Sequence, residues 1–206
     1  MKIILPMPEK IIKTSDSESG PARYCSKNPL VRKIYLDRLQ IAVDLLRDDY
    51  GRLLEAGFGN GMLFPTYNKL AQETYGIDIH GKEKEIAALF KGDFRYGSIY
   101  EIPFPDNHFD CVISLSVIEH LEDMDKALSE IGRVAQPDGD IIIGFPTDNL
   151  LIKLWFYYKK SPALKEHING PKRILEKIRK HLEVREVKKL KLLGITFYTA
   201  IKCVKK

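Results

Sequence analysis

An apolar stretch that ends in an acid and runs straight into three alternate glycines limits the folds open to this chain more than any other segment. Residues 53–61 read Leu-Leu-Glu-Ala-Gly-Phe-Gly-Asn-Gly, and a helical pattern starts at Met62. A strand that ends in a glycine turn and opens a helix brings its backbone N–H groups close to a ligand. The stretch therefore predicts a ligand-binding turn in an α/β fold.

The spacing of these glycines differs from that of dinucleotide-binding proteins. Their turns read G-x-G-x-x-G, whereas the third glycine here, Gly61, comes one residue early. An acid, Glu55, also precedes the first glycine, Gly57. The spacing therefore disfavours a nicotinamide-dependent oxidoreductase.

Strands and helices alternate along the first 146 residues. Apolar runs predict strands at residues 52–56, 74–79, 93–97, 109–115 and 140–145, and periodic patterns predict helices from 29 to about 47 and at 62–72, 81–90 and 123–134. This alternation predicts a parallel, doubly wound sheet. Beyond it, a basic helix is expected at 171–181. Residues 182–187 and 195–204 are then expected to pair as an antiparallel end of the sheet, with 188–194 between them.

Polar residues follow the predicted strands at the ends where such sheets bind ligands. Asp78 ends the second strand, 21 residues after Gly57, and a carboxylate there can accept hydrogen bonds from both hydroxyls of a ribose. Ser98 follows the third strand, and Ser114 lies at the end of the fourth. These positions predict a nucleoside site beside the glycine turn.

Composition and length indicate one soluble domain. The chain has 206 residues, of which 44% are hydrophobic and 30% charged, and no apolar run approaches the roughly 20 residues of a membrane span. The N-terminus does not read as a secretory signal. The three cysteines, Cys25, Cys111 and Cys203, are scattered. They suit a reducing cytoplasm and argue against a zinc site or a disulfide framework.

The net charge of +5 is unevenly distributed. Residues 1–150 hold 17 Lys and Arg against 24 Asp and Glu, a net charge of −7, whereas residues 151–206 hold 16 against 4, a net charge of +12. This basic end suits contact with an anionic small molecule, an anionic membrane surface or RNA. A solvated lysine-rich surface explains it equally well.

Further motifs resemble the small, type 11-like domains of the class I S-adenosylmethionine (SAM) dependent methyltransferases. Residues 99–121 read IYEIPFPDNHFDCVISLSVIEHL, which is similar to the family pattern "L-P-F-P-D-x-S-F-D-x-V" closing in "E-H-L". Residues 127–145 resemble the family's next helix and turn, "L-x-E-x-x-R-V-L-x-P-G-G". Together with the glycine turn, motifs in register cover roughly residues 50–146.

The resemblance implies a fold, an activity and a cofactor. The fold is a Rossmann-like, doubly wound, mostly parallel seven-stranded sheet with an antiparallel C-terminal strand and helices on both faces. The activity is methyl transfer (EC 2.1.1.-) from SAM, which leaves as S-adenosylhomocysteine (SAH). A single domain of residues 1–206 would comprise an N-terminal cap and helix (1–48), a SAM-binding core (50–146) and a basic lid with the C-terminal strands (147–206).

The resemblance also implies roles for individual residues. The backbone at Gly57, Gly59 and Gly61 would approach the methionine part of SAM, Glu55 would bind its amino group directly or through water, and Asp78 would hold the ribose. Ile79 would pack on the adenine, Ser114 would line the floor, and Tyr24 would close the site. Ser98 stands where the family has an acid that reads the adenine amino group, so it would bind more weakly, while Ile99 would contribute its backbone N–H.

A general base and the methyl acceptor are less well marked. His120, just beyond the fourth strand, and His167 are the candidate bases, although a histidine such as His120 also serves as a packing residue. His80 is expected on the surface. The Asn-Pro-Pro-Tyr signature of adenine and glutamine N-methyltransferases is missing after the fourth strand, which reads Ser-Leu-Ser-Val. Residues 150–158 would form either a lid over the acceptor or, as we favour, a core helix.

A small-molecule acceptor, anionic or apolar, is therefore expected. RNA ranks below it because no RNA-binding module is recognised in the sequence. A protein acceptor, or a SAM-binding protein without methyl transfer, is the alternative. No feature of the sequence predicts a metal site or an oligomeric state.

Overall fold

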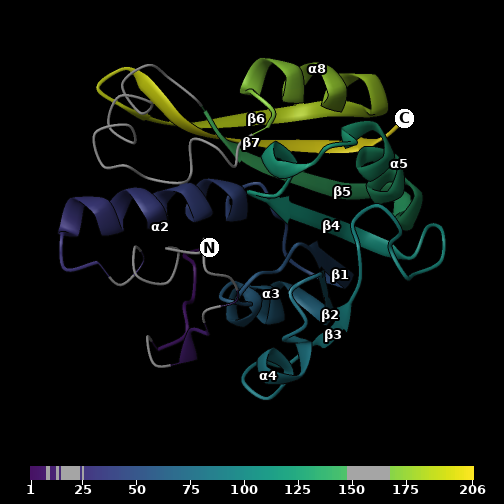
Figure 1. The fold of residues 1–206 in the computed structure, drawn as a ribbon, viewed down its shortest axis with the longest axis horizontal. Helices are drawn as coiled ribbons and strands as arrows, with labels where there is room; N and C mark the ends of the chain where they lie inside the picture. The colour runs from purple at the N-terminus through teal and green to yellow at the C-terminus, as the bar shows by residue number, and fades with distance from the viewer. Residues whose placement is uncertain (8–9, 13, 15–23, 25, 148–167) are drawn as a thin grey trace.

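Seven strands form one sheet in the computed structural model, which describes residues 1–7, 10–12, 14, 24, 26–147 and 168–206 (Figure 1). In chain order the strands are β1 (Tyr50–Ala56), β2 (Ala71–Asp78), β3 (Asp93–Tyr96), β4 (Phe109–Leu115), β5 (Ala135–Pro146), β6 (Leu182–Leu192) and β7 (Ile195–Lys205). Across the sheet they lie in the order β3-β2-β1-β4-β5-β7-β6. The first five are parallel, and β7 runs antiparallel to both β5 and β6.

The strand order reverses at a switch point at one end of the sheet, which is called the crevice below. The chain passes from β1 outward to β2 and β3, then returns to the other side of β1 to form β4 and β5. The connections on the two sides of β1 therefore separate at the carboxyl ends of β1 and β4, which is where open α/β sheets bind their ligands. The predicted fold class is confirmed.

Helices cover both faces of the sheet. One face packs against α2 (Pro29–Val43), α3 (Phe64–Leu70) and α4 (Glu83–Ala87), and the other against α5 (Met124–Val134), α8 (Pro171–His181) and a 3₁₀ turn, η2 (Ile118–His120). Successive residues of β4 alternate between the two cores: Val112 belongs to the α5 side, and Cys111 and Ile113 to the α2 side. The middle of the strand is thus continuously apolar because both of its faces are buried.

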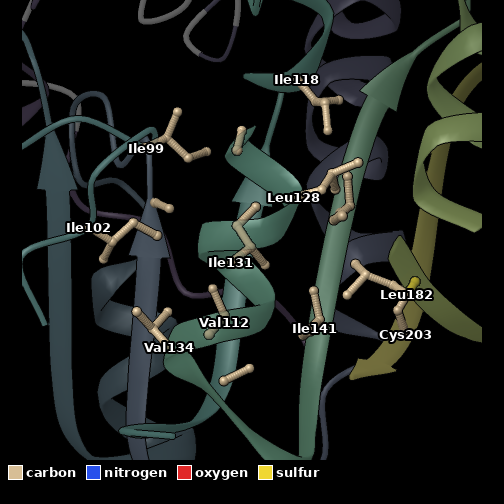
Figure 2. Close-up of a cluster of buried hydrophobic side chains, with 14 of the residues drawn as sticks. Ile99, Ile102, Val112, Ile118, Leu128, Ile131, Val134, Ile141, Leu182 and Cys203 are labelled. Atoms are coloured by element: carbon tan, nitrogen blue, oxygen red, sulfur yellow. The ribbon is translucent and has the colours of Figure 1, made fainter. Parts of the chain in front are cut away.

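The core on the α5 side shows how helix and sheet patterns combine. Leu128, Ile131 and Val134 recur at helical spacing along α5 and point at the strands below (Figure 2). Val112 of β4 and Ile141 of β5 meet them from the sheet (Figure 2). All five side chains are fully buried, so α5 is fixed over the strands whose carboxyl ends form the crevice.

Helix starts follow the local signals in the sequence. The Asn28 side-chain oxygen accepts hydrogen bonds from the N–H groups of Leu30 (3.0 Å) and Val31 (3.3 Å) at the start of α2. Asp123 accepts from Lys126 (3.0 Å) at the start of α5. Such caps satisfy N–H groups that have no partner within the helix.

Several predicted elements differ in length from those observed. The helices expected at 62–72 and 81–90 shorten to α3 and α4; α3 ends early because Ala71 is already extended and starts β2. The strand expected at 140–145 begins earlier, at Ala135. Residues 188–194, expected between two strands, belong mostly to β6. Only Leu193 and Gly194 turn, with positive φ at both (50° and 80°). Two such residues make the tight hairpin turn that suits strand twist, so the strands extend to meet it.

Some basic residues of the C-terminal part form ion pairs with acidic residues in the first 150 residues. Asp125 on α5 accepts hydrogen bonds from Lys180 (2.9 Å) and His181 (2.6 Å) of α8 and contacts Lys177. These contacts hold the pKa of Asp125 well below its usual range, with Lys177 the largest cause. Lys202 of β7 likewise pairs with Asp140 (2.9 Å). Part of the positive charge therefore holds the fold together, which favours the solvated-surface interpretation over an extended anion-binding surface.

Candidate functional site

The turn after β1 needs its glycines for both conformation and space. Gly57, Gly59 and Gly61 all have positive φ, at 84°, 51° and 69°, which strains other residues. A Cβ on Gly57 would lie 2.3 Å from a methyl group of Val117, and one on Gly61 would lie 2.9 Å from Ile86. The turn is thus pressed against the segment that follows β4.

The N–H groups of this turn are used within the protein. Those of Gly57 (2.8 Å) and Phe58 (3.4 Å) donate to the Ile77 carbonyl at the end of β2. That of Gly59 donates to the Asp78 carboxylate (2.8 Å). These three N–H groups are therefore not available to bind an anion. The absence of side chains at the glycines still lets the backbone approach a ligand closely.

Asp78 ends β2 at the mouth of the crevice. One carboxylate oxygen accepts from Gly59 and the other from the N–H of Ile79 (2.7 Å), so the side chain is fixed in orientation. Each oxygen can accept a second hydrogen bond, and the side chain remains 15% exposed. Ile79 beside it is 68% exposed, an unusual place for a large apolar residue and a suitable surface for a flat base.

His80 also belongs to this site, and its predicted place on the surface is wrong. Its ring is only 9% exposed and packs edge-on against Phe58. Nδ1 accepts from the N–H of Lys82 (3.0 Å), which leaves Nε2 to donate to the Gly59 carbonyl (2.8 Å). His80 therefore fastens the loop after β2 to the glycine turn. No spacing in the sequence singles it out, because the contact depends on the fold.

For the SAH that the sequence resemblance implies, replacing His80 with alanine should weaken binding about tenfold, since loss of one part-buried hydrogen bond and of the ring's packing costs on the order of 1–2 kcal/mol. Titration calorimetry measures the effect. His108→Ala is the matched control, because His108 is also packed against aromatic rings but lies at the opposite end of the sheet, beside Arg52. Equal affinities for wild type and His80→Ala would show that His80 does not position the turn.

Glu55 is a buried acid at the carboxyl end of β1. It is 5% exposed; one oxygen accepts from the Tyr67 hydroxyl (3.1 Å), and the other is buried without a hydrogen-bond partner among the described residues. Burial, together with the nearby charge of Asp78, raises its pKa to about 8, against the opposing effect of Tyr67. Buried carboxyl oxygens normally have donors, so this one is suited to a donor from a ligand.

The other predicted cofactor residues follow neighbouring strands and differ in burial and hydrogen bonding. The Ser114 hydroxyl on β4 is buried and, within the described part of the chain, has no hydrogen-bond partner. Ser98 accepts from the N–H of Tyr100 (3.2 Å) and so caps a turn. The Ile99 side chain lies in the core (Figure 2), which leaves its backbone as the only part available to a ligand.

The candidate base His120 and the closing residue Tyr24 come from other elements. His120 is exposed in η2, with Nε2 3.9 Å from the Glu119 carboxyl. His167 and residues 150–158 lie outside the described residues. Tyr24 is buried against α2, and its hydroxyl accepts from the Arg38 guanidinium (2.5 Å).

Neither a metal-binding group of residues nor a membrane-spanning helix is present within the described ranges. No three His, Cys, Asp or Glu residues there are grouped as metal ligands would be. None of the helices in the same ranges has the length and apolarity needed to span a membrane.

Sequence comparison identifies relatives of this chain. Residues 54–143 match a family described as a methyltransferase domain. The chain is 28% identical over 142 residues to the uncharacterised methyltransferase YcgJ of Bacillus subtilis, covering 66% of this chain and 51% of YcgJ. It is 30% identical over 103 residues to the ubiquinone/menaquinone C-methyltransferase UbiE of Vibrio cholerae, covering 45% and 40%. The chain thus spans about half or less of these relatives.

Solved structures share the fold at low sequence identity. A SAM-dependent methyltransferase from Thermotoga maritima superposes with a TM-score of 0.69 and 23% identity, over 85% of this chain and 90% of that one. The N-methyltransferase NodS from Bradyrhizobium japonicum, in complex with SAH, gives a TM-score of 0.67 and 14% identity, over 94% of each chain. These likenesses extend beyond residues 54–143 and cover most of the sheet.

Proposed function

Because the chain belongs to the class I SAM-dependent methyltransferase family, we propose that it binds SAM in the crevice between β1 and β4 and transfers the methyl group to a small molecule. The observation that carries this proposal is the buried Glu55 oxygen that has no hydrogen-bond partner among the described residues. Glu55 lies at the end of β1, just before a turn whose glycines admit a ligand close to the backbone.

The residues around the crevice suit the parts of SAM. Glu55 offers a carboxyl oxygen to the amino group, Asp78 offers two oxygens to the ribose hydroxyls, and exposed Ile79 offers an apolar surface to the adenine. Ser98 and the Ile99 backbone would meet the adenine edge, and Ser114 would line the floor. Tyr24 is proposed to close the site from the α2 side.

SAM supplies an activated methyl group, so the protein's main task is to align the acceptor with it. Alignment alone can contribute much of the rate. A base is required only for an acceptor that enters protonated, and exposed His120 is the described candidate. The division into a cap (1–48), a core (50–146) and a lid with C-terminal strands (147–206) stays part of this proposal, as does a cytoplasmic location.

Transfer of labelled methyl groups from SAM into fractionated cell extract tests the proposal. Label should appear in the small-molecule fraction with the wild-type chain and be absent with Asp78→Ala. Label in RNA or protein would instead identify that macromolecule as the methyl acceptor. Binding of SAM with no labelled product in any fraction would indicate a SAM-binding protein that transfers nothing. A thermal shift with NAD but not SAM would overturn the cofactor assignment.

A further inference from the structure

An arginine on α2 lies among three tyrosine rings. The Arg38 guanidinium carbon lies 4.7 Å from the ring centre of Tyr35, 5.4 Å from that of Tyr24 and 5.7 Å from that of Tyr198. Its Nε (3.1 Å) and one terminal nitrogen (2.5 Å) both donate to the Tyr24 hydroxyl. These four residues, from the N-terminal segment, α2 and β7, are called the Arg38 cluster below.

Within the described residues, no carboxylate forms an ion pair with Arg38. Arg47 on the same side of the sheet, by contrast, pairs with Asp140. A phenol oxygen is the hydrogen-bond acceptor of Arg38, and a guanidinium has five N–H donors in a planar fork. The Glu119 carboxyl helps to raise the pKa of the Tyr198 phenol. Arg38 is half-buried, and buried cations are normally paired, so an anion would complete this arrangement.

The Arg38 cluster adjoins the crevice proposed for SAM. The Tyr198 hydroxyl lies 3.0 Å from the hydroxyl of Ser116, which follows β4 with a positive φ of 57°. The next residue, Val117, is the one against which Gly57 is pressed. Tyr198 also pairs with Pro146 at the carboxyl end of β5. The cluster therefore lies at the ends of β4 and β5, one step across the sheet from the glycine turn.

A glycine leaves room for the phenol that links the two sites. A Cβ on Gly144 of β5 would lie 2.7 Å from the Tyr198 hydroxyl. Burial raises the pKa of Tyr198 well above its usual range, against the opposing effect of Arg38. The phenol therefore stays neutral. Because it shares one hydrogen bond with the Ser116 hydroxyl, one of the two hydroxyl protons remains for a ligand.

We propose that the Arg38 cluster binds an oxyanion carried by the methyl acceptor, with Arg38 as its charged ligand and the hydrogen-bonded hydroxyls of Tyr198 and Ser116 supplying one neutral donor between them. The three phenol rings suit an acceptor whose carboxylate or phosphate is attached to a flat, apolar body. The inference rests on the proposed function, because it is the neighbouring crevice that gives the bound molecule a methyl donor. Arg38 is thereby a determinant of acceptor specificity.

Calorimetric titration of the SAH-saturated protein with benzoate, with inorganic phosphate and with neutral benzamide tests this inference. At least one anion should bind ten times more tightly than benzamide, and benzoate or phosphate as the preferred ligand distinguishes the two anion classes. Arg38→Gln should lose at least tenfold of that affinity, and Arg38→Lys should retain part of it, because lysine keeps the charge but not the planar fork.

Arg47→Gln is the matched control, because Arg47 also lies over a tyrosine ring, that of Tyr50, but has Asp140 as its partner. It should leave anion binding unchanged. Affinity for SAH and the melting temperature, measured on each variant, show that the fold and the crevice are intact. Equal binding of anion and benzamide by wild type, or unchanged anion binding by Arg38→Gln, would overturn the inference. Failure to bind SAH would instead overturn the proposed function.

Discussion

Replacing Asp78 with alanine should lower the affinity for SAH at least 100-fold. The proposed site would lose two charge-assisted hydrogen bonds to ribose hydroxyls, each of which contributes on the order of 1.5–3 kcal/mol. The Gly59 N–H also loses its acceptor, so the glycine turn is less well fixed. Titration calorimetry with SAH measures the change directly, because a 100-fold loss equals about 2.7 kcal/mol of binding free energy.

Asp110 provides a control with nearly the same local chemistry. Its carboxylate also accepts hydrogen bonds from two backbone N–H groups, those of Gly51 (2.7 Å) and Arg52 (2.9 Å). Asp110, however, lies at the start of β4, at the opposite end of the sheet from Asp78. Asp110→Ala should lower the melting temperature and leave the SAH affinity within about twofold. Equal losses of affinity in both variants would mean that Asp78 acts through stability alone, and an unchanged affinity in Asp78→Ala would remove it from the site.

Replacing Glu55 with glutamine should weaken SAH binding at least tenfold at pH 8 and should raise the stability of the folded chain at that pH relative to wild type. The pKa of Glu55 is raised to about 8 in the folded chain, against an ordinary value of 4.5. Between these values the folded form holds a proton that the unfolded chain has lost. The contribution of Glu55 to stability therefore falls as pH rises from about 4.5 to about 8, by about 1.4 kcal/mol per pH unit.

Glutamine cannot ionise, so the variant escapes this loss. The melting temperature of Glu55→Gln relative to wild type should rise between pH 5 and pH 8, while its SAH affinity falls because the ligand's amino group loses a carboxylate. Thermal melts across that range together with calorimetry at pH 8 give both results. A difference in melting temperature that does not vary with pH would show that Glu55 ionises normally.

Binding of SAH to the wild-type protein should also release a proton from Glu55. Below pH 8 the free protein holds Glu55 mostly neutral, and a cationic amino group favours its ionised form. The SAH affinity of wild type should therefore rise between pH 6 and pH 8. Calorimetry at pH 7 in two buffers of different ionisation enthalpy measures the proton release, and Glu55→Gln should release none.

The sequence predicted those parts of the fold that depend on local patterns. Residues 109–115 and 171–181 have the bounds of β4 and α8, because a continuous apolar run and a proline-started basic helix are complete signals by themselves. The hairpin of β6 and β7 was predicted too short. Its outer strand is largely exposed and alternates weakly, so the tight turn at Leu193 and Gly194 determines its length.

Some residues of the candidate site can be predicted from sequence motifs, and others only from contacts in the folded chain. Glu55, the glycines and Asp78 lie within the family's motifs, and the fold brings them to one crevice. His80 and Arg38 follow no motif, because their roles come from contacts made in the folded chain. His80 reaches a carbonyl in the glycine turn, and Arg38 meets a tyrosine from the last strand. Such residues are found only once the sheet places distant segments together.

A crystal structure of the protein with SAH would show whether the crevice is the cofactor site. We expect the ribose hydroxyls within hydrogen-bonding distance of the Asp78 carboxylate and the amino group within that distance of the Glu55 oxygen that has no partner among the described residues. The adenine should lie on Ile79. A nucleoside bound away from Asp78, or an amino group directed away from Glu55, would mean that these residues do not hold the cofactor.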